Sequence, residues 1–284
     1  VGGLLCLIFG LRLGRSFGWT SPLVLTLLPL SPIFIGAFWR VERIARWPVL
    51  PGYLLRIRGF VVSTSSTFLA SLGVFVIWFI FPFYIADSLG GGALTLGLML
   101  ATMAFFNTVS SCAGGWLCDR YSYLPVGTGG LLVMAFGLLY LGFSDMGTSL
   151  GNVALRIGIV GAGLGLFQAA TYSLMLGSVL PDRFGTAGAA FSLAQSCGRV
   201  LSVAVIGGIF GWRNDHHLAE LVVGAESEGV AFIKAFKDVF LIGSSLGLVA
   251  AVVFLMGGWG QTRVAPTSEG AQSQMAGASD GGLD

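Results

Sequence analysis

Eight apolar segments dominate the pattern along this chain, and short polar stretches separate most of them. A helix needs about 20 apolar residues to cross the hydrocarbon core of a bilayer. On that basis the pattern predicts spans at 1–11 (truncated), 23–39, 60–86, 93–117, 125–143, 153–179, 185–212 and 239–259. The alternating ten-residue strands of a membrane barrel do not occur in the sequence. We therefore predict an all-α polytopic membrane protein.

The composition supports a membrane location and excludes other classes. Hydrophobic residues make up 55% of the chain, charged residues only 10%, and the mean hydropathy is +0.87. A soluble domain carries about 25% charged residues, so the lipid bilayer is the expected partner. A net charge of +2 without a Lys/Arg block gives no reason to expect nucleic acid. The four scattered cysteines lack metal spacing and are interpreted as small buried residues: Cys6, Cys112, Cys118 and Cys197.

The two ends of the chain differ in character. Val1 begins inside an apolar run with no Met and no basic leader, so we interpret the chain as the C-terminal portion of something longer. The segment 261–284 is polar and rich in Gly and Ser, which predicts a disordered tail.

Basic residues near the span ends predict the orientation. Eight lie on one side of the predicted spans: Arg40, Arg43, Arg46, Arg56, Arg58, Arg120, Arg183 and Arg263. Five lie on the other: Arg12, Arg15, Arg213, Lys234 and Lys237. The excess places the C-terminus in the cytoplasm. The cluster between the second and third spans contains Pro48 and Pro51, which end a helix. This segment is either a connector lying on the membrane surface between two bundles or an ordinary positive-inside loop.

A few polar residues fall inside the predicted spans, where lipid makes them costly: Asn107, Arg156, Gln168, Gln195 and Arg199. An intramembrane Arg costs about 3 kcal/mol, so such a residue usually faces a partner or a watery cavity. Gln195 and Arg199 are four residues apart and share a helical face with Phe191. We predict that this face lines a substrate path, together with Asn107 and Gln168. The alternative is a structural hydrogen bond from Arg199 to a neighbouring helix, while Arg156 is close enough to a span end to reach the interface.

Small residues are regularly spaced in three of the segments, 158–168, 185–198 and 207–211. In membranes this spacing lets helix backbones approach closely. His216 and His217 are expected in an outside loop, where a solvated loop is favoured over a weak metal site. No arrangement for nucleophilic catalysis is present, so the chain is not predicted to be an enzyme and no cofactor is expected.

One polar interruption resembles a known family signature. The stretch GGWLCDRYSYLP, residues 114–125, is similar to the major facilitator motif G-x-L-x-D-R-x-G-x-R/K. Four of its positions match: Gly115, Leu117, Asp119 and Arg120. Ser122 stands where the motif has Gly, and Leu124 where it has a basic residue. The resemblance implies that these residues form a cytoplasmic latch, with Asp119 accepting hydrogen bonds from a helix N-terminus in a tight loop.

Other stretches extend the resemblance to the fourteen-span drug:proton antiporters. Residues 17–25 and 38–60 resemble the two extra central helices of that family, and 180–210 its next-to-last helix. The stretch GAGLGLFQ, 161–168, is similar to fungal members, some of which resemble vacuolar basic amino-acid transporters. The resemblance implies two central helices and a basic cytoplasmic connector in 1–58, a six-helix bundle of the major facilitator fold in 59–260, and a cytoplasmic tail in 261–284.

The resemblance implies a secondary transporter, with proton-coupled export of amphipathic organic compounds or drugs as the expected activity. The alternatives are an amino-acid transporter of the plasma or vacuolar membrane, and a membrane scaffold that transports nothing. Because no acid lies deep in any predicted span, the coupling carboxylate is expected in a missing N-terminal half. The family often has Arg where this chain has Gln195 and Gly where it has Arg199. We therefore expect the positive charge to be shifted by one helical turn along the same face.

Overall fold

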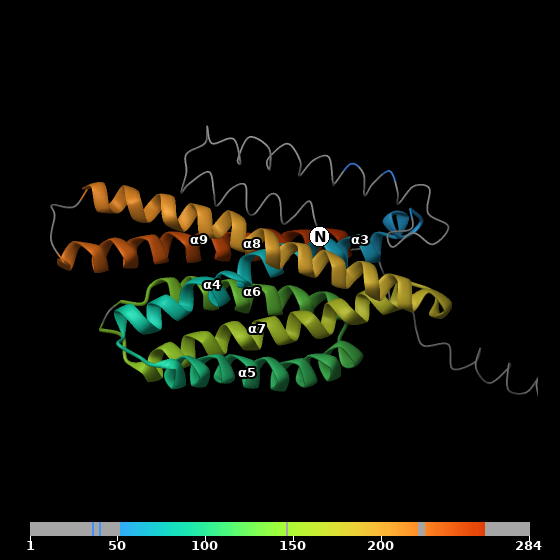
Figure 1. Ribbon diagram of the computed structural model, residues 1–284. Helices are drawn as coiled ribbons and strands as arrows, with labels where there is room; N and C mark the ends of the chain where they lie inside the picture. Colours follow the sequence, from blue (N-terminus) through green and yellow to red (C-terminus); the bar gives the residue numbers. More distant parts are fainter. Residues whose placement is uncertain (1–35, 37–39, 41–51, 146, 221–224, 259–284) are drawn as a thin grey trace, which may run out of the picture.

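The computed structural model describes residues 36, 40, 52–145, 147–220 and 225–258 of the chain. Within these ranges it contains helices and no strand (Figure 1), which confirms the predicted all-α class. The predicted spans at 1–11 and 23–39, and the tail 261–284, lie outside the described residues. The orientation in the membrane also stays a prediction.

Among the described residues, six long helical segments are apolar enough to cross a membrane, and they match the last six predicted spans. A short 3₁₀ helix, Leu54–Arg56, precedes them. The helices are α3 (Arg58–Val74), α4 (Val76–Phe83), α5 (Ala93–Arg120), α6 (Tyr123–Gly142), α7 (Leu150–Gly177), α8 (Phe184–Glu220) and α9 (Ala225–Gly258). Helices α3 and α4 together form a single span, Arg58–Ala86.

The described end of the basic connector is fixed to this bundle. Leu54 is fully buried in a cluster with Phe60, Met175 and Phe191. The guanidinium group of Arg183 lies 4.4 Å from the centre of the Tyr53 ring. Since most of the connector lies outside the described residues, its course along the membrane surface stays a prediction.

The first described span is broken in its middle. At Phe75 the backbone leaves regular α-helical geometry, and the helix resumes at Val76. Pro82 lies inside α4, and a π-helical turn, Tyr84–Ser88, follows it. A proline removes one backbone hydrogen bond and disturbs the turn before it. The span can therefore change direction beside its neighbours.

The last two helices are longer than predicted, and this corrects two expectations. Helix α8 continues to Glu220, so His216 and His217 lie on its last turns and not in a loop. The final candidate span begins at Gly229 and not at 239, which places Asp238 inside it. The Asp238 Oδ2 atom is 2.9 Å from Arg213 Nε and 3.0 Å from His217 Nε2. These contacts join α8 to α9 and give the charged residues in this part of both helices partners within the protein.

Glycines set the packing around α7, as the small-residue spacing predicted. A methyl group added at Gly161 or Gly165 would overlap the backbone of α5, and one at Gly163 would overlap the backbone of α6. Close backbone approach is the usual role of such glycines in membrane helices. In the second predicted stretch the outcome differs: Gly198 packs against α3, whereas Gly185 and Gly188 face open space.

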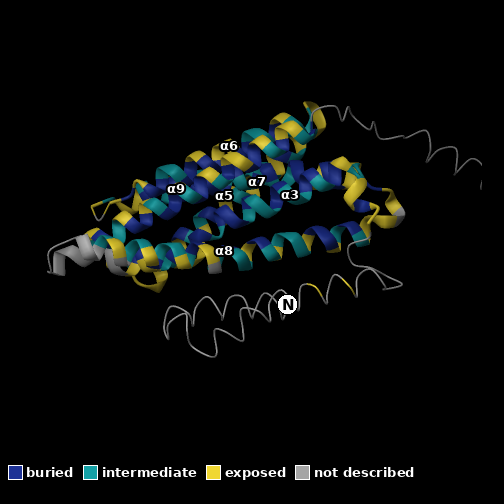
Figure 2. Cartoon of the chain, turned by 90° about the horizontal axis from the view of Figure 1, so that it is seen from above, coloured by how far each residue is buried: buried dark blue, intermediate teal, exposed yellow. Residues whose placement is uncertain are grey.

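The helices form one bundle in which α7 lies between α5 and α6, while α9 packs on α6, α3 and α8 (Figure 1). The core contains large apolar side chains from every helix of this set, among them Phe81, Phe167, Phe236, Phe240 and Phe254. Figure 2 shows buried positions along the middle of the bundle and exposed positions along α6. Only 11% of the most apolar window of α5 and 18% of that of α8 are buried, so these helices present large surfaces outward.

Candidate functional site

A cavity of about 490 Å³ lies among α3, α4, α5, α7 and α8. Its size falls within the roughly 300–1,000 Å³ range of small-molecule sites. All five residues predicted to line a substrate path border it: Asn107, Gln168, Phe191, Gln195 and Arg199. The structure thus brings together side chains that are up to 92 positions apart in the sequence.

The cavity lies at the middle of the candidate spans. Arg199 is 15 residues from both ends of the span Phe184–Asn214. Asn107 is 14 residues from the start of α5 and 13 from its end. At about 1.5 Å per residue, Arg199 is roughly 22 Å along the helix axis from each end. Secondary transporters bind their substrates at this depth.

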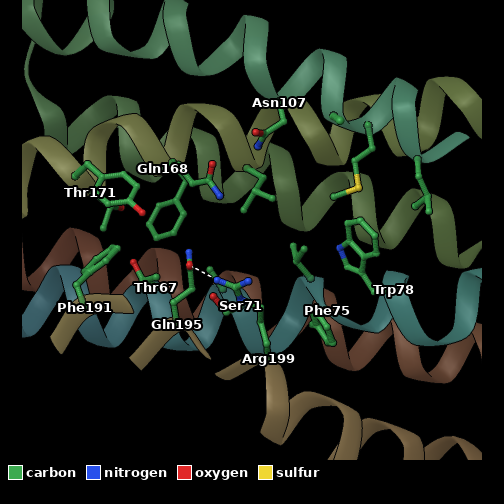
Figure 3. Close-up of a pocket in the computed structure, with 18 residues that line it drawn as sticks. Thr67, Ser71, Phe75, Trp78, Asn107, Gln168, Thr171, Phe191, Gln195 and Arg199 are labelled. Atoms are coloured by element: carbon green, nitrogen blue, oxygen red, sulfur yellow. Dashed lines mark hydrogen bonds between the residues drawn. The ribbon is translucent and has the colours of Figure 1, made fainter. Parts of the chain in front are cut away.

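The polar side chains approach the cavity from two sides (Figure 3). Asn107 and Gln168 extend from α5 and α7, while Gln195 and Arg199 extend from α8. An Nη atom of Arg199 donates a hydrogen bond to Oε1 of Gln195, one turn earlier on the same helix. Asn107 Nδ2 is 3.5 Å from the carbonyl oxygen of Gly161. This hydrogen bond of Arg199 therefore stays within α8, which disfavours the structural alternative of a bond to another helix.

Sequence reasoning missed the wall contributed by the charge-free span. Thr67, Ser71, Phe75 and Trp78 all border the cavity. Their spacing of four, four and three residues places them on one helical face. This spacing was the available signal, but hydroxyl and aromatic side chains inside an apolar run do not stand out from membrane-facing residues.

Two buried hydroxyl groups belong to the same lining. Thr67 is 3% exposed and Thr171 is not exposed at all. Neither Oγ1 atom has a hydrogen-bond partner among the described residues. Figure 3 shows the two threonines on different walls. A buried hydroxyl without a partner costs free energy, so either group would gain from a hydrogen bond to a bound molecule.

Aromatic rings complete the lining, and they come from three walls. Phe75 and Trp78 belong to the broken span, Phe167 to α7 and Phe191 to α8. The ring of Phe191 lies 5.0 Å from that of Tyr172. Together with the polar groups, this arrangement suits an amphipathic organic molecule with a flat apolar part.

Arg156 corrects the expectation that it reaches the membrane interface. This residue is only 8% exposed. Its Nη1 atom donates to the carbonyl oxygen of Tyr140 and to Oγ of Ser144, both at 2.9 Å, and its Nε donates to Oδ1 of Asn152 at 3.1 Å. Its guanidinium carbon also lies 4.1 Å from the centre of the Tyr140 ring. Because these protein groups satisfy the charge, Arg156 stays inside the bundle.

The signature residues Gly115, Leu117, Asp119 and Arg120 occupy the last turns of α5, so Asp119 lies on the helix and not in the loop after it. Asp119 and Arg120 are exposed, and the guanidinium of Arg120 is 5.6 Å from the centre of the Trp116 ring. The close approach to α7 is made by the preceding glycine, Gly114. Whether these residues act as a latch stays a prediction.

The turn after this helix has an unusual backbone conformation at Ser122. Ser122 has φ 155° and ψ 156°, a backbone region that glycine favours. This is the position at which the family signature has Gly. The serine hydroxyl accepts a 3.5 Å hydrogen bond from the backbone N–H of Leu124, which caps α6. Among the described residues, no group of three or more His, Cys, Asp or Glu is arranged to hold a metal ion.

Comparisons with known proteins agree with this architecture. The sequence profile of the Major Facilitator Superfamily matches residues 63–277. The chain is 29% identical over 220 residues to the multidrug transporter protein MdtP of Bacillus subtilis, covering 78% of this chain and 40% of that protein. It is 28% identical over 213 residues to multidrug resistance protein 3 of the same organism, covering 73% and 41%.

A fungal relative is also similar over a shorter stretch. The efflux pump DEP3 of Fusarium langsethiae is 30% identical over 149 residues, which cover 51% of this chain and 26% of that pump. The chain spans about two fifths of the length of the two bacterial relatives. Because the superfamily profile covers most of the chain, this protein belongs to the Major Facilitator Superfamily. It is an integral, multi-pass membrane protein.

Proposed function

We propose that this chain is the C-terminal part of a secondary transporter that exports amphipathic organic compounds, drugs among them. The observation that supports this proposal most is the cavity at mid-span, whose lining combines amide, hydroxyl and guanidinium groups with aromatic rings. The relatives named as multidrug transporter, multidrug resistance protein and efflux pump support the same direction of transport. In this proposal a second six-helix half closes the open side of the cavity.

Proton coupling is the finer part of the proposal. It needs an acid that titrates as access alternates between the two sides of the membrane. Asp238 lies within a candidate span, but Arg213 and His217 hold its carboxylate. These contacts suit an ion pair that joins α8 to α9, away from the cavity lining. We therefore keep the coupling acid in the N-terminal half.

The test is dye efflux from cells that lack their own drug pumps and express the full-length protein. We expect such cells to accumulate at most half as much of an amphipathic fluorescent dye as cells with an empty vector. A protonophore should abolish the difference. Equal accumulation in expressing and control cells, with the protein present in the membrane, would refute export.

A matched pair of tryptophans tests the cavity separately. Trp78 borders the cavity and is 53% exposed, whereas Trp212 is 63% exposed and lies outside the lining. Because neither side chain is buried in the core, truncation should leave the fold intact. We expect Trp78→Ala to reduce efflux at least threefold and Trp212→Ala to leave it unchanged. If the two variants reduced efflux equally, this cavity would not be the site of export.

A further inference from the structure

We propose that the cavity selects amphipathic aromatic anions, such as arylcarboxylates, over cations of the same shape. This inference rests on the proposed transport function and names its substrate class. The first observation is the charge of the lining. Among the described residues that border the cavity, Arg199 alone is charged, and none is acidic. A cation in this part of the cavity would face a positive charge without compensation.

The hydrogen-bonding groups of the lining point to the same class. Arg199 uses one of its five N–H donors on Gln195, and this bond takes one of the two lone pairs of the glutamine Oε1. The Gln195 amide nitrogen is left to donate. The hydroxyls of Thr67 and Thr171, buried and without partners among the described residues, can donate as well. Donors on three helices therefore surround one cavity.

The geometry of guanidinium favours a carboxylate in particular. A planar guanidinium group can bind both oxygens of a carboxylate through two parallel N–H···O bonds. Hydrogen bonds with an ionised donor are among the strong ones, and Arg199 lies at mid-span beside the cavity. The bond to Gln195 holds the side chain along the wall of the cavity (Figure 3). The charged group is thus positioned before a ligand arrives.

The apolar part of the ligand is set by the aromatic rings that the first described span contributes to the lining. Phe75 and Trp78 lie at the break in the first span, and Trp78 is 53% exposed. A fused aromatic ring could stack on these side chains while its carboxylate reaches Arg199. A cavity of about 490 Å³ accommodates a molecule of this size. Basic amino acids fit neither the rings nor the charge.

Two probes with the same ring and opposite charge test the inference: 2-naphthoate and 2-naphthylmethylammonium. Binding of each radiolabelled probe is measured on the full-length protein in nanodiscs, with empty nanodiscs subtracted. We expect 2-naphthoate to bind at least tenfold more tightly than the amine. Arg199→Gln should weaken 2-naphthoate at least tenfold, and Arg199→Lys should weaken it less. Equal or tighter binding of the amine to the unchanged protein would overturn the inference.

Two further variants guard against trivial explanations. Arg56→Gln removes an exposed arginine outside the cavity and should leave both affinities unchanged. Thr171→Val keeps the shape of the side chain and removes its unpartnered hydroxyl, so it should weaken 2-naphthoate about threefold. If Arg199→Gln fails to fold, unchanged 2-naphthoate binding by Thr171→Val would count against the inference. Dye efflux without anion preference would overturn this inference alone, and anion binding without efflux would overturn the proposed function alone.

Discussion

Helices α7 and α8 contain the same kinds of residue, but these residues make different contacts in the two helices. Each has glycines every few residues and one arginine inside its predicted span. In α7 the glycines contact α5 and α6, and Arg156 donates its hydrogen bonds to protein groups. In α8, Gly198 packs against α3, but Gly185 and Gly188 face open space, and Arg199 borders the cavity with a bond only one turn away along its own helix.

This difference separates a structural helix from one that is available for function. The most apolar window of α7 is 56% buried, and that of α8 is 18% buried. A buried arginine with several protein partners is part of the fold, because its removal leaves those partners unsatisfied. An arginine with spare donors beside a cavity can meet a ligand at little cost to the fold. The contrast makes specific predictions about stability.

The largest expected effect concerns Arg156. Arg156→Ala should lower the free energy of unfolding by about 4 kcal/mol, because hydrogen bonds to a charged group contribute about 1.5–3 kcal/mol each and are not additive. The measurement is reversible unfolding in mixed micelles with increasing denaturing detergent. Arg120→Ala is the control, since that side chain is exposed at the end of α5 and its loss should cost below about 0.5 kcal/mol. Equal losses of unfolding free energy for the two variants would contradict a structural role of Arg156.

Glycine substitutions test the packing half of the comparison. Gly163→Ala in α7 should destabilise the protein by about 3 kcal/mol, because the added methyl group meets the backbone of α6. Gly188→Ala in α8 meets nothing within 4 Å and should stabilise the helix by up to about 1 kcal/mol. The same unfolding measurement applies to both. Opposite signs are expected, and a loss at Gly188 as large as that at Gly163 would contradict the difference between the helices.

The smallest expected effect on stability is at Arg199. Arg199→Ala should change the free energy of unfolding by less than about 0.5 kcal/mol, because the side chain is exposed and its bond lies within α8. Its transport activity should nevertheless be lost in the full-length protein. A loss of stability comparable to that of Arg156→Ala would restore the alternative of a structural hydrogen bond. Intact transport by the variant would rule out a role for the shifted charge.

Some of the candidate site could be predicted because costly residues stand out in an apolar sequence. Gln195 and Arg199 share a face by their spacing, and the structure places both at the cavity with Asn107 and Gln168. Thr67 and Thr171 could not be selected in the same way. A hydroxyl in a membrane helix usually bonds to its own backbone, as Thr102 and Thr108 do in α5. Only the packing of the neighbouring helices shows which hydroxyls lack a partner.

The sequence by itself determined the all-α membrane class, the last six helical spans and the family. A helix that crosses lipid needs a certain length and an apolar composition, and both can be read directly from the sequence. Only the tertiary structure decided which groups the two arginines bind. In sequence both Arg156 and Arg199 are single charges within apolar spans, yet the partners of Arg156 come from another helix and the loop after it, Tyr140 and Ser144, as well as from Asn152. Which groups satisfy a buried charge depends on helix–helix contacts, and single-helix periodicity contains no information about them.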